Sequence, residues 1–156
     1  MKKIRNFIAI LLTICILSGC AYTDVEKQIK STSFKTSEVQ KEEDLLIAQG
    51  EVKVYDSYGV LLSVEVSEDI SGTFNIIYTK DNNELKIFQD YREIMSLDKA
   101  AVDYAKSGNI DVDLEKGINN FIISGEDCMC EYKVTFSVSD ESKVQSFDGG
   151  FLMPHE

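Results

Sequence analysis

Two of the four cysteines stand two positions apart, in Cys128-Met129-Cys130, and this spacing has the clearest chemical potential in the chain. Neighbouring thiols can form half of a metal site or a redox pair. A zinc site usually needs four nitrogen or sulfur ligands, and the single histidine, His155, stands beside the C-terminus. In a strand the two Cα atoms would be about 6.6 Å apart with parallel side chains, near the limit for a disulfide. We expect two buried thiols, with a disulfide at a bulge and a metal or redox role as alternatives.

Acidic and amide side chains in two segments could supply oxygen ligands to Ca²⁺. Asp81 and Asn83 stand in a run typical of a turn, and Asp111 and Asp113 alternate along a run typical of a strand. Calcium takes six to eight oxygen ligands, but the spacing of an EF-hand loop is absent. We expect a solvated turn and strand face, with a metal site as the weaker alternative, and no bound cofactor.

No constellation in the sequence indicates catalysis. A Ser-His-Asp or Cys-His arrangement needs a histidine near the nucleophile, and His155 lies in the tail. Neither a P-loop nor a G-x-G-x-x-G run is present. We therefore expect a protein that is not an enzyme.

Four aromatic residues stand near expected turns or on the side of a strand that faces away from the core: Tyr55, Tyr58, Phe88 and Tyr91. Exposed aromatic rings can stack on sugars or anchor a protein partner. The absence of tryptophan makes a sugar-binding face the weaker option. Packing in the core or at a sheet edge is the alternative for each ring.

The elements that must position these residues are strands, because apolar residues alternate with polar ones from Gly50 onward. The run 128–138 is the clearest, with Cys128, Cys130 and Phe136 on one face. Similar strands are expected at 51–57, 59–67, 73–79, 84–91, 109–115, 118–125 and 143–147. The pattern predicts an all-β domain, an antiparallel β-sandwich that is immunoglobulin-like or jelly-roll in outline, with a curled barrel as the alternative.

Three local features are expected within this domain. A hairpin should join the strands that contain Phe74 and Leu85, through Asp81-Asn82-Asn83. A short helix is expected over 96–106, where apolar residues recur at helical spacing. In the strand 59–67, strict alternation would place Leu61 on the face opposite Leu62.

The segment 20–49 is polar and predicts a tether, followed by a domain over 50–156. If flexible, about 29 residues of tether would span about 27–32 Å. A short helix over 37–48 and a first strand at 44–49 are the alternatives within it.

The N-terminus has the order of a secretory signal: Lys2, Lys3 and Arg5, an uncharged apolar run over 7–17, then small residues. The run is too short to span a bilayer. Its end, Leu17-Ser18-Gly19-Cys20, resembles the lipobox of bacterial lipoproteins. The resemblance implies a signal peptide over 1–19, cleavage between Gly19 and Cys20, and a diacylglycerol on the Cys20 sulfur, which palmitate would label.

The charge balance excludes a nucleic-acid partner. The chain has 16 basic and 27 acidic residues, and without the expected signal its formal net charge falls from −11 to −14. Such a charge repels phosphate backbones and anionic lipid, so acyl chains and not a basic patch would hold the membrane. We expect a cell-membrane lipoprotein, extracytoplasmic and lipid-anchored, whose domain is a non-catalytic binding or interaction module. The sequence does not identify its ligand, and an envelope or cell-surface protein is the candidate partner. The alternatives are a structural accessory of an envelope complex and a small-ligand, calcium or redox carrier.

Overall fold

The structure is a computed structural model and describes residues 32–42, 45–55, 57–80, 83–98 and 105–152. The expected signal peptide, Gly19, Cys20, Asp81, the core of the expected helix and His155 therefore lie outside the described residues. Among the described residues, no helix is long and apolar enough to cross a bilayer.

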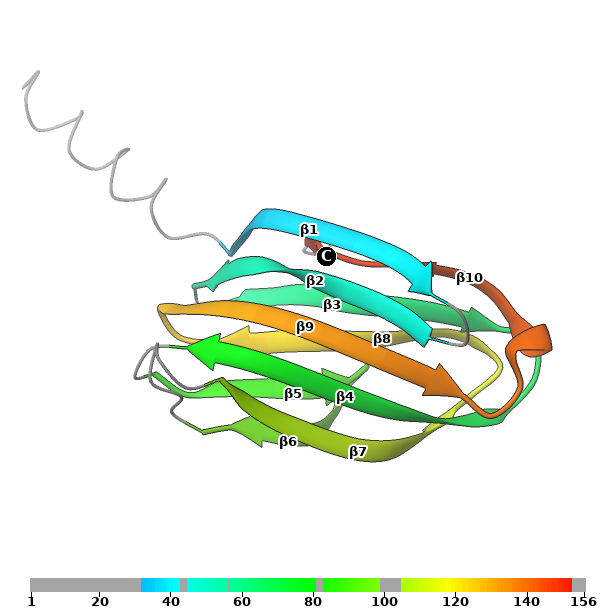
Figure 1. The fold of residues 1–156 in the computed structure, drawn as a ribbon. Helices are drawn as coiled ribbons and strands as arrows, with labels where there is room; N and C mark the ends of the chain where they lie inside the picture. The colour runs from blue at the N-terminus through cyan, green and yellow to red at the C-terminus, as the bar shows by residue number, and fades with distance from the viewer. Residues whose placement is uncertain (1–31, 43–44, 56, 81–82, 99–104, 153–156) are drawn as a thin grey trace, which may run out of the picture. The chain divides into compact units, whose positions relative to one another are not determined.

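The described chain forms two antiparallel sheets packed face to face (Figure 1). Sheet A has the strand order β1-β2-β9-β4-β7, and sheet B the order β10-β3-β8-β5-β6, with β11 also paired to β3. The strands are β1 (Ser33–Glu42), β2 (Leu45–Val54), β3 (Ser57–Val66), β4 (Ile70–Lys80), β5 (Leu85–Gln89), β6 (Arg92–Leu97), β7 (Lys106–Leu114), β8 (Gly117–Gly125), β9 (Cys128–Val138), β10 (Val144–Asp148) and β11 (Phe151–Leu152). The predicted antiparallel β-sandwich is confirmed.

Three phenylalanines join the two sheets at the centre of the core. Phe121 of β8 stacks on Phe74 of β4, with ring centroids 4.9 Å apart, and its other neighbour is Phe136 of β9 at 5.0 Å. All three side chains are fully buried. The period-two pattern places Phe74 and Phe136 inward. For Phe121 the pattern of 118–125 leaves the inward face open, because residues 121–123 are all apolar, and the structure places its ring in the core.

The expected tether over 20–49 is wrong in its second half, because 33–42 and 45–49 belong to β1 and β2. The helix over 37–48 is also wrong, and the alternative of a strand at 44–49 is the better prediction. Strand β1 is polar because it is an edge strand, paired only with β2, and solvent covers most of its outer side. The composition of this segment resembles that of a disordered segment, but pairing with β2 makes it a strand.

The hairpin expected between Phe74 and Leu85 is wrong, since β4 lies in sheet A and β5 in sheet B. Strand β5 instead forms a hairpin with β6, whose two-residue turn holds Asp90 at a φ of 51°. In the helix expected over 96–106, Ser96 and Leu97 belong to β6 and Lys106 to β7. Residues 99–104 of that expectation lie outside the described part.

A bulge in β3 explains a further difference. The register with β8 shifts between Val60 and Leu62, so Leu61 and Leu62 both join the core although strict alternation puts them on opposite faces. Val60 is fully buried but lies outside the core cluster, on the outer side of the sheet opposite Ile122.

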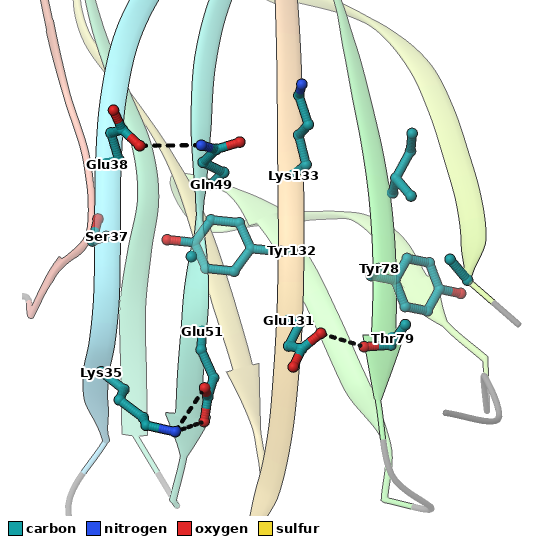
Figure 2. Close-up of a pocket in the computed structure, with 13 residues that line it drawn as sticks. Lys35, Ser37, Glu38, Gln49, Glu51, Tyr78, Thr79, Glu131, Tyr132 and Lys133 are labelled. Carbon is teal, nitrogen blue, oxygen red and sulfur yellow. Dashed lines mark hydrogen bonds and ion pairs between the residues drawn. The ribbon is translucent and has the colours of Figure 1, made fainter. Parts of the chain in front are cut away.

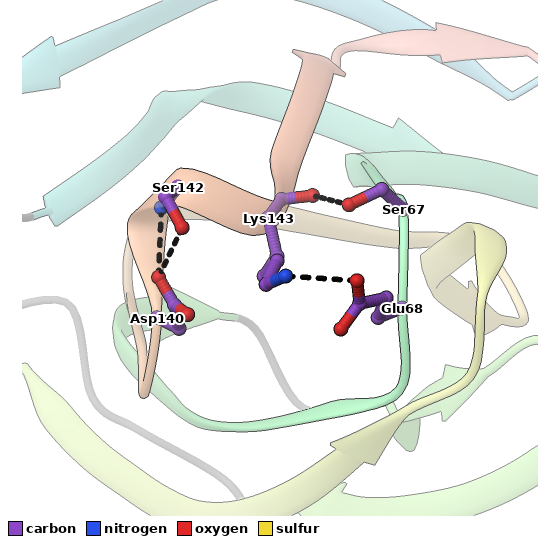
Figure 3. Close-up of polar contacts among 5 residues, drawn as sticks. All are labelled: Ser67, Glu68, Asp140, Ser142 and Lys143. Atoms are coloured by element: carbon purple, nitrogen blue, oxygen red, sulfur yellow. Dashed lines mark hydrogen bonds and ion pairs between the residues drawn. The ribbon is translucent and has the colours of Figure 1, made fainter.

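A C-terminal segment closes one side of the sandwich (Figure 3). A short 3₁₀ helix, η1 (Glu141–Lys143), is capped by Asp140, which accepts hydrogen bonds from the backbone (3.0 Å) and hydroxyl (2.7 Å) of Ser142. These bonds lower the pKa of Asp140. The backbone carbonyl of Lys143 accepts a hydrogen bond from the backbone N–H of Ser67 at 2.9 Å. The side-chain ammonium of Lys143 forms an ion pair with Glu68 at 2.8 Å.

Candidate functional site

A polar hollow of about 860 Å³ opens on the outer face of sheet A (Figure 2). Strand pairing brings its floor together: Glu38, Gln49, Lys133 and Ile77 stand side by side on β1, β2, β9 and β4. The next outward-facing row contains Glu51, Glu131 and Thr79. The hollow is therefore made by residues that are far apart in sequence.

Most charges of this hollow are already satisfied. Lys35 pairs with Glu51 at 2.9 Å, and the Gln49 amide donates to Glu38 at 3.1 Å. The Thr79 hydroxyl is 3.5 Å from Glu131. Among the described residues Lys133 makes no ion pair. The hollow can accept a small anionic group at Lys133, but its outer-facing residues offer no aromatic ring.

Two tyrosines line the hollow from below, and their side chains belong to the core. Tyr78 and Tyr132 are both buried, and Tyr132 stands opposite Gly50, which leaves room for its ring. The Tyr132 hydroxyl is directed toward Ser37 yet makes no hydrogen bond of good geometry with a described residue (Figure 2). Burial raises the pKa of Tyr132 and, with the nearby Asp98, that of Tyr78.

The outer face of sheet B carries a continuous apolar row. Strand pairing sets Phe151 opposite Val60, Val60 opposite Ile122, and Ile122 opposite Phe88. Directly opposed side chains in a sheet lie about 4.5–5.5 Å apart at Cβ. Val60 and Ile122 are buried, Phe88 is half-buried, and Phe151 is 38% exposed. We call these four residues the apolar stripe.

Tyr58 extends the stripe, because it stands two residues before Val60 on the same side of β3 and is 55% exposed. Its neighbours across the sheet are Ser124 and Lys86. Lys86 lies 3.0 Å from Glu93 and 3.6 Å from Glu84, and Glu93 is the main cause of its raised pKa. Tyr58 also lines a hollow of about 520 Å³ that includes Glu84, Glu126 and Asp127. The stripe is thus bordered mainly by carboxylates.

The four aromatic residues singled out from the sequence lie in different places in the structure. Tyr58 and Phe88 both lie on the outer face of sheet B, on β3 and β5, with β8 between them. Tyr91 is 97% exposed at the tip of the β5–β6 turn. Tyr55 is half-buried after β2, where its backbone N–H donates to the Thr32 hydroxyl at 3.0 Å.

Of the four calcium candidates the structure describes Asn83, Asp111 and Asp113, and Asn83 lies outside the strand that carries the two aspartates. Asp111 and Asp113 project from β7, where Asp111 accepts a hydrogen bond from Thr73 at 2.8 Å. Asn83 lies between β4 and β5, and its amide donates to the carbonyl of Asp127 at 2.7 Å. Within the described ranges, no group of three or more His, Cys, Asp or Glu side chains is arranged to hold a metal ion.

Cys128 and Cys130 are buried thiols on the inner face of β9. Their expected burial is confirmed. Strand pairing places Cys130 opposite Lys80, which is itself 4% exposed and donates to the carbonyl of Asn83. The thiols therefore line the core and do not face either hollow.

Sequence reasoning missed Val60, Ile122 and Phe151 as members of an outer face. One signal was present: 118–125 contains apolar residues at adjacent positions 121–123, so both faces of that strand must be covered. The strand order that brings Phe151 and Phe88 to either side of β3 and β8 has no signature in the sequence.

Solved structures of low sequence identity resemble this chain. No family model matches the chain, and no curated protein matches it. Among solved structures, a family 35 carbohydrate-binding module from Cellvibrio japonicus is similar at 18% identity, covering 65% of this chain and 78% of that one, with a TM-score of 0.44. A family 35 module from an environmental isolate covers 80% and 95% at 12% identity, with a TM-score of 0.44. A Cellvibrio mixtus lichenase module solved with cellotriose covers 69% and 91% at 11% identity, with a TM-score of 0.40.

These similarities concern the β-sandwich fold, and they carry no argument about a ligand of this chain. The protein is a β-sandwich whose two outer faces differ in chemistry, polar on sheet A and apolar in the centre of sheet B.

Proposed function

We propose that this protein is an extracytoplasmic lipoprotein, held in the cell membrane by acylated Cys20, whose sandwich is a non-catalytic module that binds an envelope or cell-surface protein. The observation that carries the binding role is the apolar stripe across β11, β3, β8 and β5. Val60 and Ile122 are already buried within the chain, so a partner would contact the partly exposed rings of Phe88, Phe151 and Tyr58. Aromatic side chains are enriched in protein interfaces.

The polar hollow on sheet A supports a binding role less well. Its charges are largely paired within the chain, and a ligand would have to replace those contacts. The exposed apolar side chains described on that face, Leu45, Ile77 and Met129, stand in three separate rows and form no continuous surface. The stripe is therefore the surface on which we base the function.

The anchor is tested by metabolic labelling with palmitate and by fractionation of membranes. Cys20→Ser is expected to abolish labelling and to release the protein from the membrane. Cys15→Ser, a second cysteine change within the first 20 residues, is expected to leave both unchanged. Labelling that persists in Cys20→Ser would contradict the anchor.

The binding face is tested by affinity isolation from detergent-solubilised membranes. Tyr58→Ser with Phe88→Ser is expected to lose a stoichiometric protein partner. The control, Ile77→Ser with Met129→Ser, changes two apolar residues on sheet A that are each 48% exposed, and is expected to retain the partner. Retention of the protein on insoluble polysaccharide with no protein partner would contradict the proposal.

A further inference from the structure

The size of the stripe limits the strength of any complex that forms on it. Specific interfaces usually involve about 20–30 residues a side, and smaller ones belong to weak or transient complexes. Val60 and Ile122 are buried, so the stripe and its extension offer the rings of Phe88, Phe151 and Tyr58. A partner that diffuses in solution would be held weakly by such a surface.

A shared membrane would compensate for this weakness, because two anchored proteins meet at a raised effective concentration. Strand β1 begins at Ser33, and Thr32, 12 residues after Cys20, can lie at most about 43 Å from it. The Tyr55 backbone bonds to Thr32, and Tyr58 follows within about 11 Å of chain. The stripe therefore begins within about 60 Å of the lipidated residue.

The charge around the stripe defines the chemistry of the partner. Carboxylates of Glu84, Glu93, Glu126 and Asp127 stand near Tyr58, Lys86 and Phe88. Lys86 pairs with Glu84 and Glu93, and Lys53 lies 3.9 Å from Asp127, so the four carboxylates outnumber these two basic residues. The chain without its first 19 residues carries a formal net charge of −14, which disfavours a second copy of itself. A complementary surface has an apolar ridge flanked by lysine or arginine.

We infer that the partner of the apolar stripe is a protein held in the same membrane, with a basic rim around an apolar ridge. This inference rests on the proposed lipid anchor. It adds the location and the charge of the partner, which the proposed function leaves open.

The test is photo-cross-linking in cells that make the full chain, with a photoreactive amino acid in place of Tyr58 or of Phe88. The control position is Ile77, which is 48% exposed on the outer face of sheet A. We expect an adduct from Tyr58 and Phe88, and none from Ile77, with a protein that mass spectrometry identifies as having a membrane span or lipid anchor.

Two variants and one control in the photoreactive background test the membrane location and the charge of the partner. Inserting 60 Gly and Ser residues after Ala21 is expected to reduce the adduct several-fold, since effective concentration falls with tether length. Glu84→Lys is expected to reduce it similarly, whereas Glu42→Lys, an exposed carboxylate on β1, is expected to leave it unchanged.

Each contrary outcome overturns the inference. These outcomes are no adduct, an adduct with a soluble protein, an adduct of two copies of this chain, or a yield unaffected by the insertion. Palmitate labelling of the same cells distinguishes failure of this inference from failure of the proposed function. If Cys20 is acylated and no adduct forms, the inference fails while the anchor stands; if Cys20 is not acylated, the proposed function itself fails.

Discussion

Asp90, in the turn between β5 and β6, and Asn120, on β8, are joined by three hydrogen bonds. The Asp90 N–H donates to the Asn120 carbonyl at 2.8 Å, and the Asp90 carboxylate accepts from the backbone and side-chain N–H groups of Asn120 at 3.0 and 3.2 Å. These bonds hold the turn that follows Phe88 against β8, beside the apolar stripe.

Asn120→Asp is expected to destabilise the protein by about 1–3 kcal/mol at pH 7, because it places a second carboxylate against Asp90 in place of a donor. Relative to wild type, the loss should shrink as the pH falls and one carboxylate is protonated. Urea unfolding at pH 7 and pH 4 measures both. Asn120→Ala removes the donor alone and should lack this pH dependence; the same pH dependence in both variants would disprove the contact.

Gly150→Ala is expected to destabilise the protein by about 3 kcal/mol or more. Its φ of 69° is unfavourable for alanine, and an added Cβ would overlap the Ser37 side chain. Gly117→Ala is the matched control: its φ is 111° but no atom lies within 4 Å of the added Cβ, so strain alone should cost about 1–2 kcal/mol. Combining Gly150→Ala with Ser37→Gly should recover part of the loss. Equal losses at both glycines would contradict the close approach.

Phe121→Ala is expected to reduce the free energy of unfolding by about 3–5 kcal/mol, because it removes the ring that joins Phe74 and Phe136 across the two sheets. Phe88→Ala should cost about 1 kcal/mol or less, since Phe88 lies outside the core cluster and is half-buried. Chemical denaturation of both variants measures the difference. Comparable losses would place Phe88 in the core and not on a binding face.

Tyr132→Phe is expected to leave stability at pH 7 unchanged or to raise it by about 1 kcal/mol, because it removes a buried hydroxyl that lacks a good hydrogen bond. The raised pKa of Tyr132 also predicts an alkaline effect. Above about pH 10 the tyrosine ionises in the unfolded chain before it does in the folded one, so wild-type stability falls as pH rises.

The phenylalanine variant should lose less stability between pH 9 and pH 11 than wild type, by thermal unfolding. Tyr78, whose pKa is also raised, contributes to the alkaline loss of stability in both proteins. A loss of more than about 1 kcal/mol at pH 7 would instead show that the hydroxyl bonds to Ser37 in solution.

Cys128 and Cys130 are expected to resist alkylation in the folded protein and to react fully in urea, since both are buried on the inner face of β9. Peptide-resolved mass spectrometry after labelling with N-ethylmaleimide separates them from Cys20. Rapid labelling of both in the folded protein would overturn their placement in the core.

Several elements of the sandwich could be predicted because their signal is local. The alternation in 128–138 places Cys128, Cys130 and Phe136 inward, and the structure agrees. The prediction of a tether over β1 was wrong because an edge strand on a polar surface has the composition of a linker. The prediction of a hairpin between β4 and β5 was wrong because a turn sequence gives no information about which sheet the following strand joins.

The sequence by itself determined that the chain is a β protein, which side of most strands faces the core, and that its charge is strongly negative, because side-chain alternation and charge are properties of neighbouring residues. Only the tertiary structure decided that Phe151, Val60, Ile122 and Phe88 form one surface and that Lys133 meets Gln49 in a hollow. These neighbours come from strand order and register, which depend on packing between residues far apart in the chain.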